Sequence, residues 1–215
     1  MNRSATYITT LSGRQLHIFN PAPDQFDHED LATGLSNECR WGGQMKRFYS
    51  VAQHALYVGL HAQALATQAG LGSEVSRGIG LLGHLHDAAE GLGLRDMPTP
   101  IKRFLPEYVA AEHELLMCVL CKYAGHLFDS DLFRAKAAVV SGRGYMEPVL
   151  HPFVGDADAV LLATEHRDLI THRVEGSWKP AAKPLSMTIR PVEPKEAKAA
   201  WLKRFDELTE GKFTQ

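Results

Sequence analysis

The sequence predicts an all-α protein with a small β-hairpin at its N-terminus. Long segments repeat apolar residues with the period of a helix, glycines and prolines separate these segments, and short β-rich runs occur in the first residues. A chain of 215 residues with 45% hydrophobic residues is ordinary for one domain with its own core. We therefore expect a single domain over residues 1–215, with the hairpin in residues 1–25, a helical core in residues 39–172, and a loop and final helix in residues 174–215.

The first segments carry local signals for the hairpin and for a short helix. Two β-rich runs flank Ser12 and Gly13, so we expect a hairpin that ends near Pro21. The segment "FDHEDLATGLSNE" follows, with Asp27 placed as an N-cap and Asp30 in the first turn. A short helix is therefore predicted directly after the hairpin.

Longer segments with apolar residues at helical spacing predict the remaining helices. One begins after Ser50, which suits an N-cap, and a second covers roughly Glu74 to Glu90, where Gly91 and Gly93 are stop signals. Four more are predicted in "EYVAAEHELLMCVLCKYAG", "SDLFRAKAAVVSGRG", "DADAVLLATEHRDLITHR" and "PKEAKAAWLKRFDELTE".

Composition and charge exclude several classes of protein. A net charge of −2 provides no basic field for nucleic acid, and no run of about 18 apolar residues could span a membrane. The first residues lack the pattern of a signal peptide, and three cysteines are few and odd in number, which favours a reducing compartment. Cys118 and Cys121 have CxxC spacing within an apolar run, so we expect both to pack in the core. The sequence predicts a cytoplasmic protein with neither nucleic-acid nor membrane partners.

A dense group of acids and histidines lies in "GHLHDAAEGLGLRDMPTP". On a continuous helix, His86 and Glu90 fall on one apolar stripe with Asp87 on its shoulder, whereas His84 lies roughly 200° from His86. Burying ionised carboxylates costs several kcal/mol unless a partner compensates. A divalent cation would compensate, and the alternative is an ion-pair cluster with Arg77, Arg95 or Arg103.

A histidine on another helix favours the cation. His54 projects from the apolar stripe of the helix after Ser50, where a lone histidine is usually a hydrogen-bonded core residue. Together with His86 and Asp87, however, it would give a metal three protein groups and leave positions open for water and substrate.

A fourth ligand is predicted in "GDADAVLLATEHRDL". Asp156 and Asp158 lie about 200° apart on a helix, so at most one of them faces the site. Asp158 shares an apolar stripe with Glu165 and is the predicted ligand, whereas Asp156 follows Gly155 and is the predicted helix cap.

The ordered set of these histidines and aspartates resembles the HD-domain metal-dependent phosphohydrolases, an all-α superfamily. The blocks "CRWGGQMKRFYSVAQH", "HDAAEGLGLRDMPTPIK" and "DADAVLLATEHRDL" are similar to bacterial 5'-deoxynucleotidases and phage dATP triphosphohydrolases. The blocks span most of residues 39–169. The resemblance implies an HD-domain helical bundle, with residues 39–172 as its catalytic core.

The resemblance also implies a role for each matching residue. Arg40 and Trp41 match a pair that contacts phosphate and packs against the nucleoside. Pro98 and Lys102 are further candidates for substrate binding, for which the alternatives are a plain turn proline and a solvated surface lysine. The implied metal ligands are His54, His86, Asp87 and Asp158, and the implied acids near the nucleophilic water are Glu90 and Asp96.

The predicted function is hydrolysis of the α-phosphate ester of deoxynucleotides, which gives a deoxynucleoside with phosphate from a dNMP or triphosphate from a dNTP such as dATP. The expected cofactor is one divalent metal ion (zinc, cobalt, manganese, iron or magnesium), because the ligand types suit several metals. The expected partners are the deoxynucleotide and further copies of the chain, in the cytoplasm or in the host cytoplasm if a phage encodes it. The alternative is a nucleotide-sensing HD module without turnover.

Overall fold

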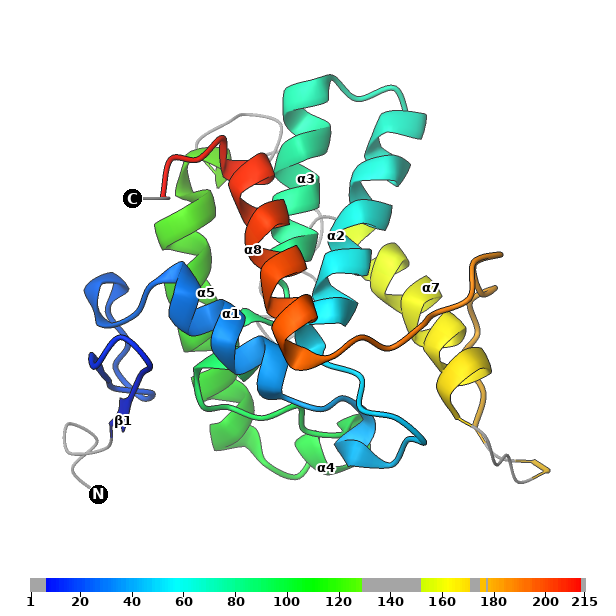
Figure 1. The fold of residues 1–215 in the computed structure, drawn as a ribbon, viewed down its shortest axis with the longest axis horizontal. Helices are drawn as coiled ribbons and strands as arrows, with labels where there is room; N and C mark the ends of the chain where they lie inside the picture. The colour runs from blue at the N-terminus through cyan, green and yellow to red at the C-terminus, as the bar shows by residue number, and fades with distance from the viewer. Residues whose placement is uncertain (1–6, 129–151, 171–174, 177, 214–215) are drawn as a thin grey trace.

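The structure is a computed structural model that describes residues 7–128, 152–170, 175–176 and 178–213. In these residues the protein is mostly helical, with one antiparallel two-stranded sheet near the N-terminus (Figure 1). Strands β1 (Ile8–Thr9) and β2 (Gln15–Leu16) pair around the predicted turn. The predictions of a mainly helical fold and of an N-terminal hairpin are therefore confirmed, whereas the helix expected in "SDLFRAKAAVVSGRG" lies outside the described residues.

The helices arrange around α2, which contacts α1, α3, α7 and α8 (Figure 1). None of the described helices combines the length and hydropathy needed to cross a membrane. The described α-helices are α1 (His28–Asn37), α2 (Val51–Gln68), α3 (Ser73–Leu85), α4 (Thr99–Lys102), α5 (Pro106–Phe128), α7 (Pro152–Leu169) and α8 (Pro194–Thr209). Short 3-10 helices cover η2 (Pro23–Gln25), η3 (Trp41–Gly43) and η4 (Ala88–Leu92).

Two predicted N-caps begin their helices as expected. The Asp27 side chain accepts a hydrogen bond from the Asp30 backbone N–H, and Ser50 accepts one from the Gln53 backbone N–H. Asp30 also accepts hydrogen bonds from the backbone N–H and the hydroxyl of Ser12, each at 2.8 Å. One carboxylate therefore joins the hairpin turn to α1.

Glycines bring α2 and α3 into close contact. A Cβ on Gly83 would lie 3.0 Å from Gly59 Cα, and a Cβ on Gly59 would lie 2.9 Å from the carbonyl oxygen of Gly80. Larger side chains at these positions would force the helices apart. The close crossing brings His54 of α2 near His86, which follows α3.

The prediction of one helix through Glu90 is wrong, because α3 ends at Leu85 and η4 begins at Ala88. His86 Nδ1 donates a 2.8 Å hydrogen bond to the Gly83 carbonyl, the group that would accept from the Asp87 N–H in a continued α-helix. Asp87 leaves helical geometry with ψ of 19°. The turn places His86 and Asp87 at the end of α3 rather than along its side.

The core continues under α8, which contributes Trp201. Trp201 is fully buried and stacks on His84 at a centroid distance of 4.5 Å. Burial lowers the pKa of His84 to about 3, so His84 is a neutral core residue that turns away from His86, as predicted. Of the two cysteines expected in the core, Cys118 is half-buried against it and Cys121 is exposed, so the prediction for Cys121 is wrong. Helical spacing moves Cys121 off the buried face of α5.

The segment before α8 has no regular structure, yet side chains of α2 and α7 bind its backbone. Gln53 donates to the Arg190 carbonyl at 2.8 Å and accepts from the Val192 N–H at 3.1 Å. Asp168 of α7 accepts from the Ile189 N–H at 2.8 Å. These contacts hold residues 189–192 against both helices.

Candidate metal centre

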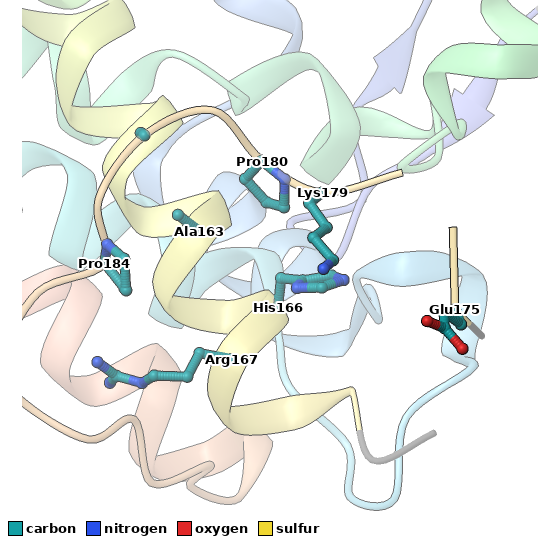
Figure 2. Close-up of a pocket in the computed structure, with 8 residues that line it drawn as sticks. Ala163, His166, Arg167, Glu175, Lys179, Pro180 and Pro184 are labelled. Atoms are coloured by element: carbon teal, nitrogen blue, oxygen red, sulfur yellow. The ribbon is translucent and has the colours of Figure 1, made fainter. Parts of the chain in front are cut away.

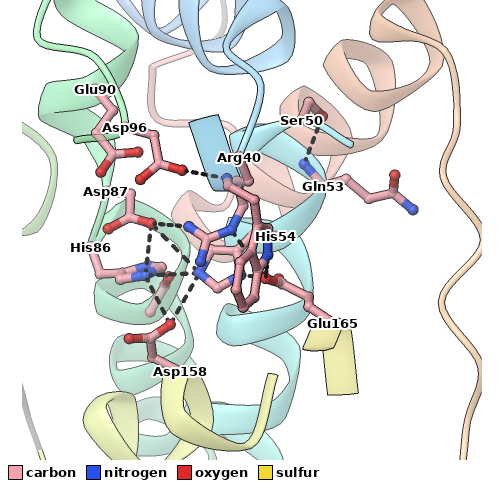
Figure 3. A network of polar contacts seen from close by, with 12 residues as sticks. Arg40, Ser50, Gln53, His54, His86, Asp87, Glu90, Asp96, Asp158 and Glu165 are labelled. Carbon is pink, nitrogen blue, oxygen red and sulfur yellow. Dashed lines mark hydrogen bonds and ion pairs between the residues drawn. The ribbon is translucent and has the colours of Figure 1, made fainter. Parts of the chain in front are cut away.

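Three side chains at the centre of the fold converge on one point (Figure 3). His54 from α2 and the adjacent pair His86 and Asp87 each offer one ligand atom, and these atoms all lie within 4.8 Å of one another. His54 is fully buried and His86 is nearly so. A group of this composition could hold a metal ion.

Asp158 borders this group from α7. Its Oδ1 lies 3.2 Å from His54 Nε2 and 3.9 Å from His86 Nε2, and its side chain is 43% exposed. The cluster therefore reaches solvent at Asp158. The predicted cap role of Asp156 is wrong, because α7 begins one turn earlier at Pro152 and leaves Asp156 exposed within the helix.

The hydrogen bonds of the two histidines favour a shared cation. Nδ1 of His86 faces the Gly83 carbonyl, and Nδ1 of His54 lies 2.6 Å from Glu165 Oε1, so both Nδ1 atoms act as donors. In the neutral rings the lone pairs are then on the Nε2 atoms, which face each other at 3.3 Å. Two lone pairs at this distance repel unless a proton or a cation lies between them. The residues thus fit a metal by their donor set and by their tautomers.

The pKa shifts in the cluster also favour a positive charge between these side chains. Burial and the Arg40 charge lower the pKa of His54, but Glu165 and Asp158 outweigh them and raise it to about 9. Burial alone would raise the pKa of Asp87, yet His86, His54 and Arg40 hold it well below its usual range. Asp87 is therefore a carboxylate at neutral pH, available to a cation.

Arg40 is the cation beside the cluster. Its Nε donates to Glu165 Oε2 and its Nη1 donates to Asp87 Oδ2, both at 3.2 Å. Two of the arginines considered for an ion-pair cluster have other partners. Arg77 pairs with Glu210, and Arg95 pairs with Glu38. The alternative of an ion-pair cluster with Arg77 or Arg95 is therefore wrong, because Arg40, which is far away in the sequence, supplies the counter-charge.

Trp41 is held in an uncommon conformation next to Arg40. Its φ is +58°, in the left-handed region that costs a bulky residue about 1–3 kcal/mol. Two carboxylates oppose that cost: Asp96 accepts from the Trp41 backbone N–H at 3.2 Å, and Glu165 accepts from the indole Nε1 at 3.0 Å. Asp96 therefore contacts the Arg40–Trp41 pair directly.

Glu165 was missed as a site residue. It is fully buried and contacts His54, Arg40 and Trp41. The sequence placed it on the same helical stripe as Asp158, seven positions earlier. A buried acid on a stripe that carries a predicted metal ligand was the available signal for its role.

Glu90 and Lys102 lie close to each other and within electrostatic reach of Asp87. Glu90 is buried, and its Oε2 has no hydrogen-bond partner among the described residues. Burial raises the pKa of Glu90, and the charges of Asp87 and Asp96 raise it further. Lys102 Nζ lies 2.7 Å from Glu112 Oε1 and 4.0 Å from Glu90 Oε1, so it is a partly buried lysine in an acidic cluster and not a solvated one.

Pro98 lies near the loop that carries Trp41. Its Cγ would be 3.9 Å from a Cβ on Gly42, the residue after Trp41. The segment that follows Asp96 therefore approaches η3 in space, although more than 50 residues separate them in the chain. Pro98 therefore lies beside the turn that carries Trp41.

A cavity of about 420 Å³ lies elsewhere, between α7 and the proline-rich segment (Figure 2). None of its lining residues is a predicted site residue, and its His166 ring lies 6.2 Å from the Trp41 ring, centroid to centroid. The lining residues are Ala163, His166, Arg167, Glu175, Lys179, Pro180, Ala182 and Pro184. The candidate chemistry lies in the buried cluster and not in this cavity.

The fold and the cluster define a helical protein with a candidate metal centre assembled from α2, the α3–η4 turn and α7. The chain is 30% identical over 210 residues to "Uncharacterized protein YfdR" from Escherichia coli (strain K12). The aligned region covers 95% of this chain and 97% of that protein. The chain therefore belongs to the same family as this Escherichia coli protein. It is also 38% identical over 117 residues to "Uncharacterized protein RCAP_rcc00048" from Rhodobacter capsulatus, over 53% of this chain and 56% of that protein. No family model matches the chain.

Proposed function

We propose that the chain is an HD-domain phosphohydrolase that uses a divalent metal to cleave the α-phosphate ester of deoxynucleotides. The observation that carries this proposal is the convergence of His54 Nε2, His86 Nε2 and an Asp87 oxygen beside the Arg40 guanidinium. A metal site next to an arginine suits an anionic ester. The products would be a deoxynucleoside and either phosphate or triphosphate.

The ligand set would be His54, His86, Asp87 and Asp158. A divalent cation held there would polarise a phosphoryl oxygen and make water a stronger nucleophile at neutral pH. The 43% exposure of the Asp158 side chain gives this set an open side for water and substrate. Hydrogen bonds from both Nδ1 atoms orient the two imidazoles before a metal binds.

Arg40 and Trp41 would bind the substrate. Glu165 holds Arg40 through Nε and Asp87 holds it through Nη1, so the planar guanidinium is already oriented, and Nη2 would donate to a phosphate oxygen with little loss of order. The Trp41 ring and Pro98 would flank the nucleoside, and Lys102 would add positive charge near the phosphate. Asp96 would act on this pair by holding the Trp41 backbone.

Glu90 would carry the proton. Its Oε2 is buried and has no partner among the residues that the structure describes, so it can accept a proton from the attacking water and return it to the leaving 5'-oxygen. Burial and the charges of Asp87 and Asp96 raise its pKa, the direction in which enzymes commonly shift a glutamate that transfers protons.

A substrate panel tests the proposal. The purified protein is incubated with dNMPs, dNDPs, dNTPs and rNTPs and with Zn²⁺, Co²⁺, Mn²⁺ or Mg²⁺, and the products are separated by chromatography. We expect deoxynucleoside release and a loss of about 10²–10⁴-fold in kcat for Glu90→Gln, whereas Glu207→Gln, at an exposed position of α8, retains the wild-type rate. Appearance of dADP and inorganic phosphate from dATP would contradict attack at the α-phosphorus.

The same panel separates the enzyme from a nucleotide-sensing module. A sensor would bind a nucleotide in equilibrium dialysis without turning it over, and Asp87→Ala would leave that binding unchanged. An enzyme would lose turnover in Asp87→Ala. Assembly into a homo-oligomer, which also belongs to the proposal, is measured by sedimentation equilibrium.

A further inference from the structure

We infer that Glu165 is a positioning residue that couples the metal centre to the Arg40–Trp41 pair, so that metal binding at His54 alters the environment of Trp41. The inference deepens the proposed function and rests on it in treating these groups as one site. Metal binding and the state of Trp41 can nevertheless be measured without any substrate.

One carboxylate oxygen of Glu165 serves the metal centre. Oε1 lies 2.6 Å from Nδ1 of His54, and both side chains are fully buried. The contact fixes the ring orientation and leaves Nε2 directed toward His86 Nε2 at 3.3 Å. Carboxylates that hold a metal-binding histidine in this way typically contribute about 10–100-fold to metal affinity.

The other oxygen serves the Arg40–Trp41 pair. Oε2 accepts from Arg40 Nε at 3.2 Å and from Trp41 Nε1 at 3.0 Å. The indole is thereby fixed in a residue whose backbone already has a positive φ of 58°. Among the residues that the structure describes, Glu165 is the hydrogen-bond acceptor of the indole N–H.

The two oxygens belong to one rigid planar group without solvent access, so the two contacts are not independent. A movement of His54 toward a metal pulls Oε1, and Oε2 must then move relative to Arg40 and Trp41. Water cannot replace a lost contact in a side chain with 0% exposure. Glu165 also lies on α7 with Asp158, so both respond together to a shift of that helix.

Glu165→Gln tests the coupling while keeping the size of the side chain. The amide has a single acceptor oxygen, so it can serve His54 or the Arg40–Trp41 pair but not both. With Zn²⁺ as the probe, isothermal titration calorimetry should show an affinity lower by about 10–100-fold. The emission of Trp41, obtained as the difference between the protein and its Trp41→Phe variant, should respond to Zn²⁺ in the wild type and lose that response in Glu165→Gln.

Asp168→Asn is the matched control. Asp168 is a mostly buried carboxylate on the same helix and accepts a hydrogen bond from the Ile189 N–H, not from a ligand histidine. Its substitution should leave the Zn²⁺ affinity within about twofold, as for other changes away from the site. Circular dichroism and thermal unfolding establish that each variant is folded.

Two results would overturn the inference: an unchanged Zn²⁺ affinity in Glu165→Gln, or a weakened affinity with a wild-type response of Trp41. If Glu165→Gln does not fold, Trp41→Phe takes its place, since it removes one donor from Oε2 without touching His54. Its Zn²⁺ affinity should change by about fivefold or more, and no change would refute the coupling. If the Zn²⁺ affinity and the Trp41 emission change as expected but no nucleotide is hydrolysed, the proposed function is contradicted and the coupling is not.

Discussion

Replacement of Gly34 by alanine should destabilise the protein, although alanine normally favours a helix. Gly34 lies in α1 and faces Gly91 of η4, the residue that follows Glu90. A Cβ on Gly34 would lie 1.7 Å from the Gly91 carbonyl oxygen and 2.5 Å from its carbonyl carbon. Ordinary contact begins at 3.4 Å, so the two backbones must separate by about 1.7 Å.

The size of the effect follows from the atoms involved. Overpacking of a core costs about 1–3 kcal/mol and sometimes more, and here both partners are backbone, so no side-chain rotation relieves the contact. Alanine returns up to about 1 kcal/mol through its helix propensity. We therefore take the upper end of this range, about 3 kcal/mol, and expect a net loss of about 2 kcal/mol, which corresponds to a decrease in Tm of about 4–8 °C for a chain of this length.

Urea denaturation followed by circular dichroism measures this loss. Gly155→Ala is the matched control, because Gly155 lies in α7 and nothing lies within 4 Å of a Cβ at that position. The control should be stabilised by up to about 1 kcal/mol, opposite in sign to Gly34→Ala. A Gly34→Ala variant as stable as the wild type would show that α1 and η4 do not meet as described.

Three more predictions concern the metal, acid stability and the core. Zn²⁺ at about 100 times its dissociation constant should stabilise the wild type by about 2.7 kcal/mol in thermal unfolding, and Asp87→Asn should lose most of this gain. Burial raises the pKa of Asp30, but hydrogen bonds from Ser12 outweigh burial and lower the pKa. Ionised Asp30 therefore stabilises the fold above about pH 4, and this stabilisation is lost as the pH falls. Asp30→Asn should flatten the pH dependence of stability in urea titrations between neutral pH and about pH 3. Trp201→Ala should cost about 3–5 kcal/mol in urea denaturation because Trp201 is fully buried, whereas the exposed Trp178→Ala should change stability by less than about 0.5 kcal/mol.

Local signals in the sequence predicted local structure. Asp27 and Ser50 each accept from an N–H three residues ahead, a contact that any chain with these residues in this order can make. The end of α3 could not be found in this way, because the glycines after Glu90 suggested a later stop. The Gly83 carbonyl instead accepts a hydrogen bond from the His86 ring. This contact depends on the orientation of the ring in the folded cluster, which local sequence does not report.

The partners of the candidate site residues were the least predictable part. Helical stripes directed His54 and Asp158 inward, and they approach each other at 3.2 Å. The contact between Arg40 and Glu165 joins residues 125 positions apart, and no periodicity reports which distant arginine will neutralise a buried acid. A partly buried carboxylate at Asp87 indicates that a cation lies nearby, but the sequence does not indicate which one. The fold brings Arg40 to this position.

The irregular segment at residues 189–192 has a consequence for how opening of the molecule can be observed. The backbone N–H groups of Ile189 and Val192 are bonded to Asp168 of α7 and Gln53 of α2, the neighbour of His54. Amide hydrogens outside helices and strands usually exchange quickly with deuterated water, whereas these two should exchange as slowly as helical ones. Their exchange rates would therefore report separation of the segment from the two helices that supply His54 and Asp158, and would show whether the site opens locally or with the whole fold.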